Sequence, residues 1–242
     1  MTRRSLIAAL GVWLAFAVPA GAAWPGGNGR IVFSSGGDLW TDAGRLTATA
    51  QEEAQASWSP DGSRLAFRTR STTGEPYHVA VMDADGSDRI DLPGGAFNET
   101  QPGWSPDGTQ IVYRRSVVGD VNSGDVWLMN ADGSNTHQLT HTHAGIYPAA
   151  WSANGDRILA AYPASHNGKL YAVDVTTGDA RALTGFVGDL FAQGLSRNGK
   201  TVLAAIGCGG TATPYGLIET IPFAGGQPNV IVRGPCRATW TA

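Results

Sequence analysis

Trp58-Ser59-Pro60-Asp61-Gly62 is the stretch that decides the fold, because the chain repeats it. The pattern returns, with increasing divergence, at Trp104-Ser105-Pro106-Asp107-Gly108, Trp151-Ser152-Ala153-Asn154-Gly155 and Leu195-Ser196-Arg197-Asn198-Gly199. The steps from Trp58 to Trp104, Trp151, Leu195 and Trp240 are 46, 47, 44 and 45 residues. A period of this length is typical of a β-propeller, in which each repeat forms one blade of four short strands.

The residues inside each period predict the four strands. The Pro-Asp-Gly segment forms a tight turn, because proline presets φ, aspartate bonds the nearby backbone and glycine accepts a positive φ. Apolar segments with few charges then predict second strands at 64–67, 110–113, 157–160 and 200–203. Third strands are expected at 77–82, 125–129, 169–173 and 217–221, and fourth strands near Leu92, Leu139, Leu183 and Ile231. Each repeat is therefore predicted to be an antiparallel meander.

The two ends of the chain are predicted to share one blade. Residues 29–33, 38–40 and 45–47 supply second, third and fourth strands, but the matching first strand would fall in an apolar leader. Residues 238–241, Ala-Thr-Trp-Thr, supply a first strand that has no blade of its own. Counting first or second strands gives five, so we expect an all-β propeller of five blades, closed by the C-terminal strand so that no sheet edge is left unpaired. The competing count of six would need a further blade that this sequence does not supply.

Residues 1–22 predict a secretory signal peptide. Met1-Thr2-Arg3-Arg4 is a basic start, residues 6–18 form an apolar run, and Ala20-Gly21-Ala22 fits a cleavage site. Paired arginines also occur in twin-arginine signals, so either export route is open, and a retained anchor is the alternative. Residues 23–242 are then one propeller domain, periplasmic or secreted, with no transmembrane segment in the mature chain. The net charge of −3 and the scattered basic residues do not indicate nucleic-acid binding.

The Trp-Ser-Pro-Asp-Gly turns, the Asp-Ala-Asp-Gly-Ser turn at 83–87 and the closing Leu-Thr pairs resemble the TolB-type, WD-repeat-like propeller repeat. The resemblance covers nearly all of the chain after residue 23. It implies a propeller with a periplasmic role in protein interaction. TolB-type proteins carry an α/β domain before the propeller, and we expect none here, which separates this chain from their assembly. A resemblance to the propeller caps of prolyl-oligopeptidase-like enzymes extends only to the cap.

Cys208 and Cys236 are expected to form a disulfide bond. An exported chain meets an oxidising compartment, and loops after second and fourth strands leave a propeller blade on the same face. Cys208 lies in a loop of the first kind and Cys236 in one of the second. The bond would close a loop of about 28 residues and contribute roughly 3 to 4 kcal/mol. Two free thiols or a metal-binding pair are the alternatives.

Glu53 and Glu99 are candidate binding residues. Each precedes a repeat tryptophan by five residues, a position that TolB-type repeats often fill with an acid, whereas the next two repeats have Ile146 and Leu190 there. This position is predicted to lie near the mouth of the central channel. The two carboxylates either hold a cation or a cationic ligand, or they are simply solvated.

A second group of candidates follows the fourth strand of the repeat that begins at Trp104. His141 and His143 alternate along the chain and would present two imidazoles to a zinc or nickel ion, or they belong to a solvated loop. Tyr147, with Phe191 and Tyr215, would serve as a stacking platform in a sugar-binding propeller. Because no cysteine or carboxylate adjoins the histidines, we expect no metal and no cofactor.

The sequence contains no catalytic motif that we can assign. There is no Gly-x-Ser-x-Gly elbow, and the Asp-x-Asp-Gly turns lack the final glutamate of a calcium loop. The predicted function is a non-enzymatic, extracytoplasmic scaffold that engages an envelope or secreted protein partner through its loop face. Two alternatives are open: a lectin-like, glycan-binding propeller, and a five-bladed glycosidase, which would need two or three converging carboxylates.

Overall fold

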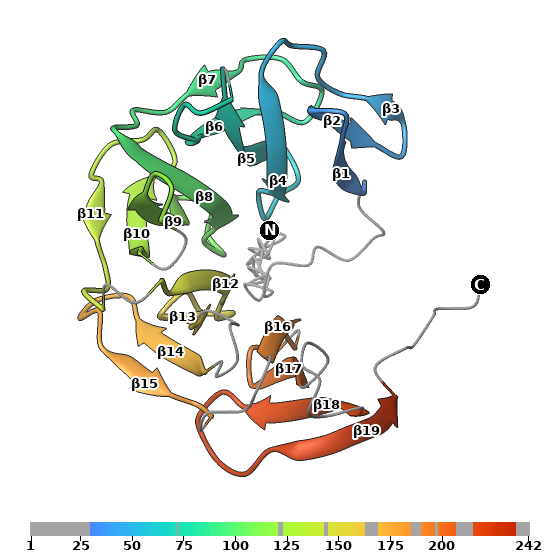
Figure 1. The fold of residues 1–242 in the computed structure, drawn as a ribbon, viewed down its shortest axis with the longest axis vertical. Helices are drawn as coiled ribbons and strands as arrows, with labels where there is room; N and C mark the ends of the chain where they lie inside the picture. Colours follow the sequence, from blue (N-terminus) through green and yellow to red (C-terminus); the bar gives the residue numbers. More distant parts are fainter. Residues whose placement is uncertain are drawn as a thin grey trace, which may run out of the picture.

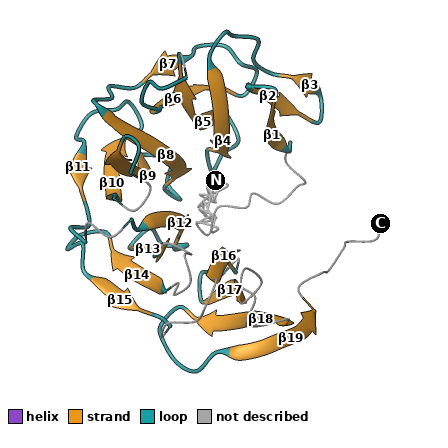
Figure 2. Cartoon of the chain, viewed as in Figure 1, coloured by secondary structure: helices purple, strands orange, loops and turns teal. Residues whose placement is uncertain are grey.

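The computed structural model describes residues 30–71, 73–120, 123–142, 145–162, 169–184, 190–196, 198–206 and 215–235. In these ranges the chain forms strands and turns and no helix. The strands make five antiparallel sheets, one of three strands and four of four strands, and each sheet is built from consecutive strands (Figure 2). The all-β fold and the antiparallel four-stranded repeat are therefore confirmed.

The sheets are called blades 1 to 5 in chain order. Blade 1 contains β1 (Val32–Ser35), β2 (Asp38–Thr41) and β3 (Gly44–Arg45). Blade 2 contains β4 (Glu52–Trp58), β5 (Arg64–Arg70), β6 (His78–Asp83) and β7 (Ile90–Asp91). Blade 3 contains β8 (Phe97–Trp104), β9 (Gln110–Val117), β10 (Asp125–Asn130) and β11 (His137–Gln138). Blade 4 contains β12 (Tyr147–Trp151), β13 (Arg157–Ala161), β14 (Leu170–Asp174) and β15 (Ala180–Ala182), and blade 5 contains β16 (Leu190–Leu195), β17 (Thr201–Ile206), β18 (Tyr215–Pro222) and β19 (Asn229–Pro235).

The blades are arranged around a common centre (Figure 1). The strands β4, β8, β12 and β16 lie toward this centre, and β3, β7, β11 and β15 lie at the periphery. Among the described strands, the ring is open between blade 1 and blade 5. Among the described residues blade 1 has no inner strand, so β1 is its edge there, and Ile31 and Phe33 at that edge are 68% and 48% exposed. The proposed closing strand at 238–241 lies outside the described residues, so closure stays a prediction.

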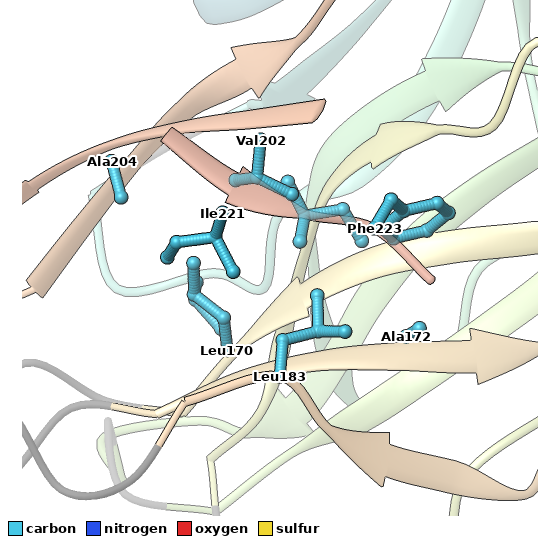
Figure 3. Close-up of a cluster of buried hydrophobic side chains, with 9 residues drawn as sticks. Leu170, Ala172, Leu183, Val202, Ala204, Ile221 and Phe223 are labelled. Carbon is cyan, nitrogen blue, oxygen red and sulfur yellow. The ribbon is translucent and has the colours of Figure 1, made fainter. Parts of the chain in front are cut away.

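The hydrophobic core consists of layers between neighbouring blades. Leu170 and Leu183 of blade 4 pack with Val202, Ile221 and Phe223 of the blade 5 segment, as Figure 3 shows. Equivalent layers lie between blades 1 and 2, 2 and 3, and 3 and 4. Since blades 2, 3 and 4 each bury both faces against described neighbours, their strands are apolar on both sides.

The repeat tryptophan connects the inner strands of adjacent blades. The indole Nε1 of Trp104 donates to the carbonyl of Ser57 at 3.2 Å, and Nε1 of Trp151 donates to the carbonyl of Gly103 at 3.1 Å. Each acceptor is the residue that precedes the tryptophan of the previous blade. Nε1 of Trp58 is buried and has no acceptor among the described residues. The blade before it is blade 1, whose described strands β1 to β3 include no inner strand that could supply that carbonyl.

The Ser-x-Asp-Gly turns form one hydrogen-bonded unit. The hydroxyl of Ser59 donates to Asp61 Oδ1 at 2.6 Å and accepts from the Arg64 amide at 2.9 Å. Gly62 has a φ of +70°, which glycine adopts without strain. The Ser59 hydroxyl, followed by the Ser63 amide and hydroxyl, lowers the pKa of Asp61 to about 2. Because these polar groups bond to one another within the turn, the structural role of the turn is enough to explain the repeated Ser-x-Asp-Gly sequence.

Candidate binding face

Each blade has two functionally different ends. The turn face carries the Ser-x-Asp-Gly and Asp-Gly-Ser turns. The loop face carries the loops that follow the second and fourth strands of each blade. In blades 2 and 3 these loops are 71–77, 92–96, 118–124 and 139–146, of which residues 72, 121–122 and 143–144 are not described. The inner strands β4 and β8 begin on the loop face, so Glu53 and Glu99 lie there as the sequence predicts.

Glu53 is fully buried rather than solvated. Its Oε1 accepts from the Thr49 hydroxyl at 2.9 Å and forms an ion pair with Arg89, which also pairs with Asp91 at 2.9 Å. Arg89 precedes β7 and reaches back across the blade to the loop end. The cation that Glu53 holds is therefore an arginine of its own chain.

Glu99 is 1% exposed and has the same kind of partner. Arg115 donates to Glu99 Oε1 through Nη2 at 2.6 Å and through Nε at 3.1 Å. The Arg115 guanidinium also lies 4.1 Å from the centre of the Trp127 ring and 6.0 Å from that of Phe97. Glu53 and Glu99 thus occupy equivalent buried positions and each forms an ion pair with an arginine, so of the two alternatives the solvated one does not hold for either.

The other predicted residues are spread over the same face. His141 is exposed in the loop between β11 and β12, and His143 lies outside the described residues. Tyr147 starts β12 and is half-buried, and burial raises the pKa of its hydroxyl against the opposing effect of Arg114. Within the described ranges, no three histidine, cysteine, aspartate or glutamate side chains are grouped to hold a metal ion.

Cys208 and Cys236 lie outside the described residues, so the disulfide stays a prediction. The described part of the chain has no helix that is long and apolar enough to span a membrane.

An exposed apolar patch lies on the loop face of blade 3, and the sequence analysis missed it. We define the apolar patch as Phe97, Val117 and Val118, which are 44%, 52% and 41% exposed. Phe97 and Val117 are directly opposite each other in the pairing of β8 with β9. An alignment of the repeats could have revealed the patch. The preceding repeat has the polar residues Gln51 and Ser71 at the positions of Phe97 and Val117.

A polar pocket lies beside this patch, at the loop end of blade 2. The blade 2 pocket has a volume of about 260 Å³, and its lining includes Gln51, Thr69, Arg70, His78, Asp91 and the Gly94-Gly95 segment. A side chain Cβ placed on Gly95 would lie 3.9 Å from Cδ2 of Phe97. The pocket and the apolar patch are therefore continuous across the 92–96 loop.

Arg70 lines the pocket and is held in place by Glu52 and Tyr77. Arg70 forms an ion pair with Glu52, and the Tyr77 hydroxyl donates to Glu52 Oε1 at 2.6 Å. These two donors lower the pKa of Glu52, and burial, with Glu52 as the next cause, raises the pKa of Tyr77. The guanidinium groups of Arg68 and Arg70 lie 4.2 and 4.3 Å from the centre of the Tyr77 ring. This packing fixes Arg70 at the pocket rim.

The two blade ends are also joined through the backbone. The Glu99 amide donates to the Tyr77 carbonyl at 2.8 Å, and the Tyr77 amide donates to Asn98 Oδ1 at 3.0 Å. The loop ends of blades 2 and 3 therefore form one rigid surface, with a polar pocket on one side and an apolar patch on the other.

Consecutive four-stranded antiparallel sheets around a common centre define a β-propeller. The family model of the TolB beta propeller domain matches residues 37–211, which is more than half of the chain. The chain therefore belongs to the TolB beta propeller family.

Solved structures share this fold at low sequence identity. TolB from Acinetobacter baumannii superposes with a TM-score of 0.64 at 14% identity, over 84% of this chain and 52% of that protein. A protein assigned as TolB from Agrobacterium tumefaciens gives 0.68 at 18% identity, over 86% and 78% of the two chains. An oligogalacturonate lyase in complex with manganese gives 0.63 at 13% identity, over 88% and 64%. The chain thus spans about half the length of the Acinetobacter protein, and the likeness concerns the fold. A search of the curated proteins found no match.

Proposed function

We propose that this protein is an extracytoplasmic, non-enzymatic scaffold that binds a protein partner through the loop face of blades 2 and 3. Membership of the TolB beta propeller family supports a scaffold architecture. The signal-peptide pattern of residues 1–22 supports export. The apolar patch is the observation that carries the choice of surface.

The apolar patch has the properties of a protein-binding site. Contiguous exposed apolar side chains are uncommon on a monomer unless they mark an interface. Phe97 packs near a fixed side chain, because the Arg115 guanidinium lies 6.0 Å from the centre of its ring and forms an ion pair with the buried Glu99. Aromatic residues that are fixed before binding lose little conformational freedom in the complex, which favours affinity.

The other exposed apolar side chains have simpler explanations. Ile31 and Phe33 adjoin the open edge of blade 1, where a closing inner strand is expected to cover them. Ile90, which is 58% exposed, stands on an outer strand, and Leu203 and Ile231 belong to blade 5. Scattered single residues of this kind are normal on a protein surface.

The glycosidase alternative is less well supported than the scaffold. It requires two carboxylates that face a substrate, one of them free to donate a proton. Glu53 and Glu99, the two acids proposed for that role from the sequence, are buried and paired with Arg89 and Arg115.

Capture of a partner from an extract of the native cell envelope tests the proposal. We expect the purified protein to retain one dominant protein, and the substitution Val117→Glu to abolish that capture. Ile90→Glu makes the same chemical change at an exposed apolar residue away from the patch and should leave capture intact. Both changes should alter the free energy of unfolding by no more than about 0.5 kcal/mol, because both sites are on the surface. Equal losses from both variants, or undiminished capture by Val117→Glu, would refute the choice of surface.

A further inference from the structure

In blades 1 and 3 the loop end contains its own carboxylate, whereas the equivalent residue of blade 4 is Lys169. In blade 3 the third strand begins with Asp125, which is 3% exposed. Its Oδ1 accepts from the Thr140 hydroxyl at 2.9 Å, from the Thr142 amide at 2.7 Å and from the Thr142 hydroxyl at 3.0 Å. The loop that follows the fourth strand thus closes over an internal acid.

Blade 1 repeats this arrangement. Asp38 begins its third strand, is 7% exposed, and accepts from the Thr49 amide at 3.3 Å and from Arg45 at 2.6 Å. The first threonine of each loop makes a further bond: Thr47 accepts from the Leu39 amide at 2.9 Å, and Thr140 accepts from the Val126 amide at 3.0 Å. The Leu-Thr-x-Thr sequence is therefore the device that closes the loop end.

Blade 2 has lost both halves of this device. His78 stands where blades 1 and 3 have aspartate, and Pro93, Gly94 and Gly95 stand where those blades have Thr-x-Thr. The amides of Gly94 and Gly95 donate to no described residue, although the amide equivalent to that of Gly95 binds a carboxylate in blades 1 and 3. The blade 2 pocket is the space that these replacements leave.

The His78 side chain leaves no room for a side chain at position 94. A Cβ on Gly94 would lie only 1.9 Å from Nδ1 of His78, so the imidazole occupies the space that a side chain at position 94 would need. Nδ1 of His78 is itself buried and has no hydrogen-bond partner in the described part of the chain. A buried ring nitrogen without a partner is costly unless a ligand or water satisfies it.

Hydrogen-bond donors predominate in the pocket. Besides the two glycine amides, Gln51 offers its side-chain NH2, because its Oε1 accepts from Thr69 and Arg89. Arg70 lines the rim. Asp91 is the one acid in the lining, and Arg89 pairs with it at 2.9 Å. A carboxylate accepts hydrogen bonds only, and bonds to a charged acceptor are the stronger kind.

We propose that the blade 2 pocket receives the carboxylate of an aspartate or glutamate side chain from the partner, which takes the place of the aspartate that blades 1 and 3 supply themselves. This inference rests on the proposed function, and it names the chemistry of the partner. The neighbouring apolar patch receives an apolar residue of the same partner segment, because the pocket and the patch are continuous. A volume of about 260 Å³ accommodates the side chain with its methylene groups.

The direct test is an NMR titration of the ¹⁵N-labelled protein with N-acetyl-aspartate amide. We expect saturable shifts of the Gly94 and Gly95 amides and of the Gln51 side-chain amide. N-acetyl-asparagine amide, the neutral isostere, should bind about tenfold more weakly, because it lacks the charge that strengthens the hydrogen bonds. Glucose and galactose should leave these signals unchanged. Absence of shifts with the aspartate probe, equal binding of the asparagine probe, or shifts with a sugar alone would each overturn the inference.

A variant that restores the repeat gives the second arm of the test. His78→Asp with Pro93→Thr and Gly95→Thr rebuilds the sequence of blade 3 and should fill the pocket with an internal carboxylate, so that binding of the aspartate probe is lost. Asp132→Asn on the turn face is the control and should bind the probe normally. If the triple variant fails to fold, Gly95→Thr alone tests the same point, since Gly95 lines the pocket, has no positive φ and has space for a Cβ, whose nearest neighbour would be Cδ2 of Phe97 at 3.9 Å. Retained binding in a folded pocket variant would overturn the inference.

Failure of this inference is distinguishable from failure of the proposed function. The titration measures the pocket without any partner, whereas envelope capture measures the apolar patch. A protein that ignores the aspartate probe but still loses capture through Val117→Glu retains the scaffold function with a different partner chemistry.

Discussion

Trp104 and Trp58 occupy the same position in adjacent blades and have opposite surroundings. The indole of Trp104 donates to the inner strand of the preceding blade, whereas that of Trp58 is buried and lacks an acceptor among the described residues. Asp125 and His78 also occupy equivalent positions in adjacent blades, at the loop face. Asp125 accepts hydrogen bonds from its own loop, whereas His78 borders a pocket. In both comparisons one blade lacks an interaction that its neighbour has, and a segment outside the described structure is expected to supply the missing group. For Trp58 this is the chain's own C-terminal strand, and for His78 it is a partner.

The largest effect should come from removing the C-terminal strand. Deletion of residues 236–242 leaves β1 as a free edge and Trp58 without its expected acceptor, the carbonyl of Thr239. We expect the free energy of unfolding to fall by more than about 5 kcal/mol, or the protein to aggregate, because exposed edges invite intermolecular pairing. Size-exclusion chromatography and thermal melting measure this. A monomeric truncation with a native melting temperature would show that the ring is not closed this way.

The two tryptophans sharpen that test. In the full chain, Trp58→Phe and Trp104→Phe should each cost about 1 kcal/mol beyond the shared loss of size, since each removes one hydrogen bond. Where the truncated chain still folds as a monomer, Trp58→Phe should lose this contribution while Trp104→Phe keeps it. Urea denaturation of the four variants provides the comparison, and an unchanged cost for Trp58→Phe would argue against an acceptor on the deleted strand.

Removal of one partner of a buried ion pair should have the next largest effect. Glu99→Ala leaves Arg115 without its carboxylate and should reduce the free energy of unfolding by about 3 kcal/mol. Glu52→Ala, at the more exposed pair with Arg70, should cost about 1 kcal/mol or less. Chemical denaturation at neutral pH measures both. Similar costs would mean that burial does not distinguish the two pairs.

Restoring the repeat in blade 2 should stabilise the protein modestly. The triple change His78→Asp, Pro93→Thr and Gly95→Thr supplies an acceptor for the position-95 amide, which we expect to add about 1 kcal/mol, because the opposite effects of Pro93→Thr and Gly95→Thr on the freedom of the unfolded chain offset each other. The reverse change in blade 3, Asp125→His, should destabilise. A destabilised triple variant would show that blade 2 is not a degenerate copy of the blade 3 arrangement.

The smallest effect concerns pH and the turn face. The folded-state pKa of Asp61 is about 2, below its ordinary value of 3.8, so its contribution to stability is present above about pH 4 and is lost as the pH falls toward 2. Asp61→Asn should flatten the dependence of the melting temperature on pH in this range. The turn itself should survive, because Asn198 already accepts from Ser196 at 2.7 Å and from the Lys200 amide at 3.0 Å. An unaltered pH profile would refute the assignment.

The blades could be predicted from the sequence because the residues that form each turn and strand lie close together in the chain and recur in every repeat. The Pro-Asp-Gly turns and the apolar strands recur at a fixed period, and the structure places strands where this pattern expects them. The environment of Glu53 and Glu99 was not predictable in the same way. Arg89 is 36 residues from Glu53 in the chain, and nothing in its own segment indicates that it reaches across the blade to that carboxylate.

The blade 2 pocket is an intermediate case. The replacement of aspartate by His78 and of Thr-x-Thr by Pro93-Gly94-Gly95 is visible when the repeats are aligned. Its meaning depended on the hydrogen bonds of Asp38 and Asp125, which the repeat sequence alone does not reveal. The sequence therefore shows where a repeat departs from its pattern. The structure of the intact repeats is needed to show that such a position forms a binding site.

The central claim is that the loop face of blades 2 and 3 is the partner-binding surface, and site-specific photo-crosslinking in the native cell tests it most directly. A photoreactive amino acid at Val118 lies on the apolar patch, and one at Ile90 lies on an outer strand; the native side chains are 41% and 58% exposed. We predict a discrete crosslinked protein product from position 118 that disappears when His78→Asp, Pro93→Thr and Gly95→Thr fill the pocket, and no product from position 90. A product from position 90 alone, or equal products from both positions, would contradict the account.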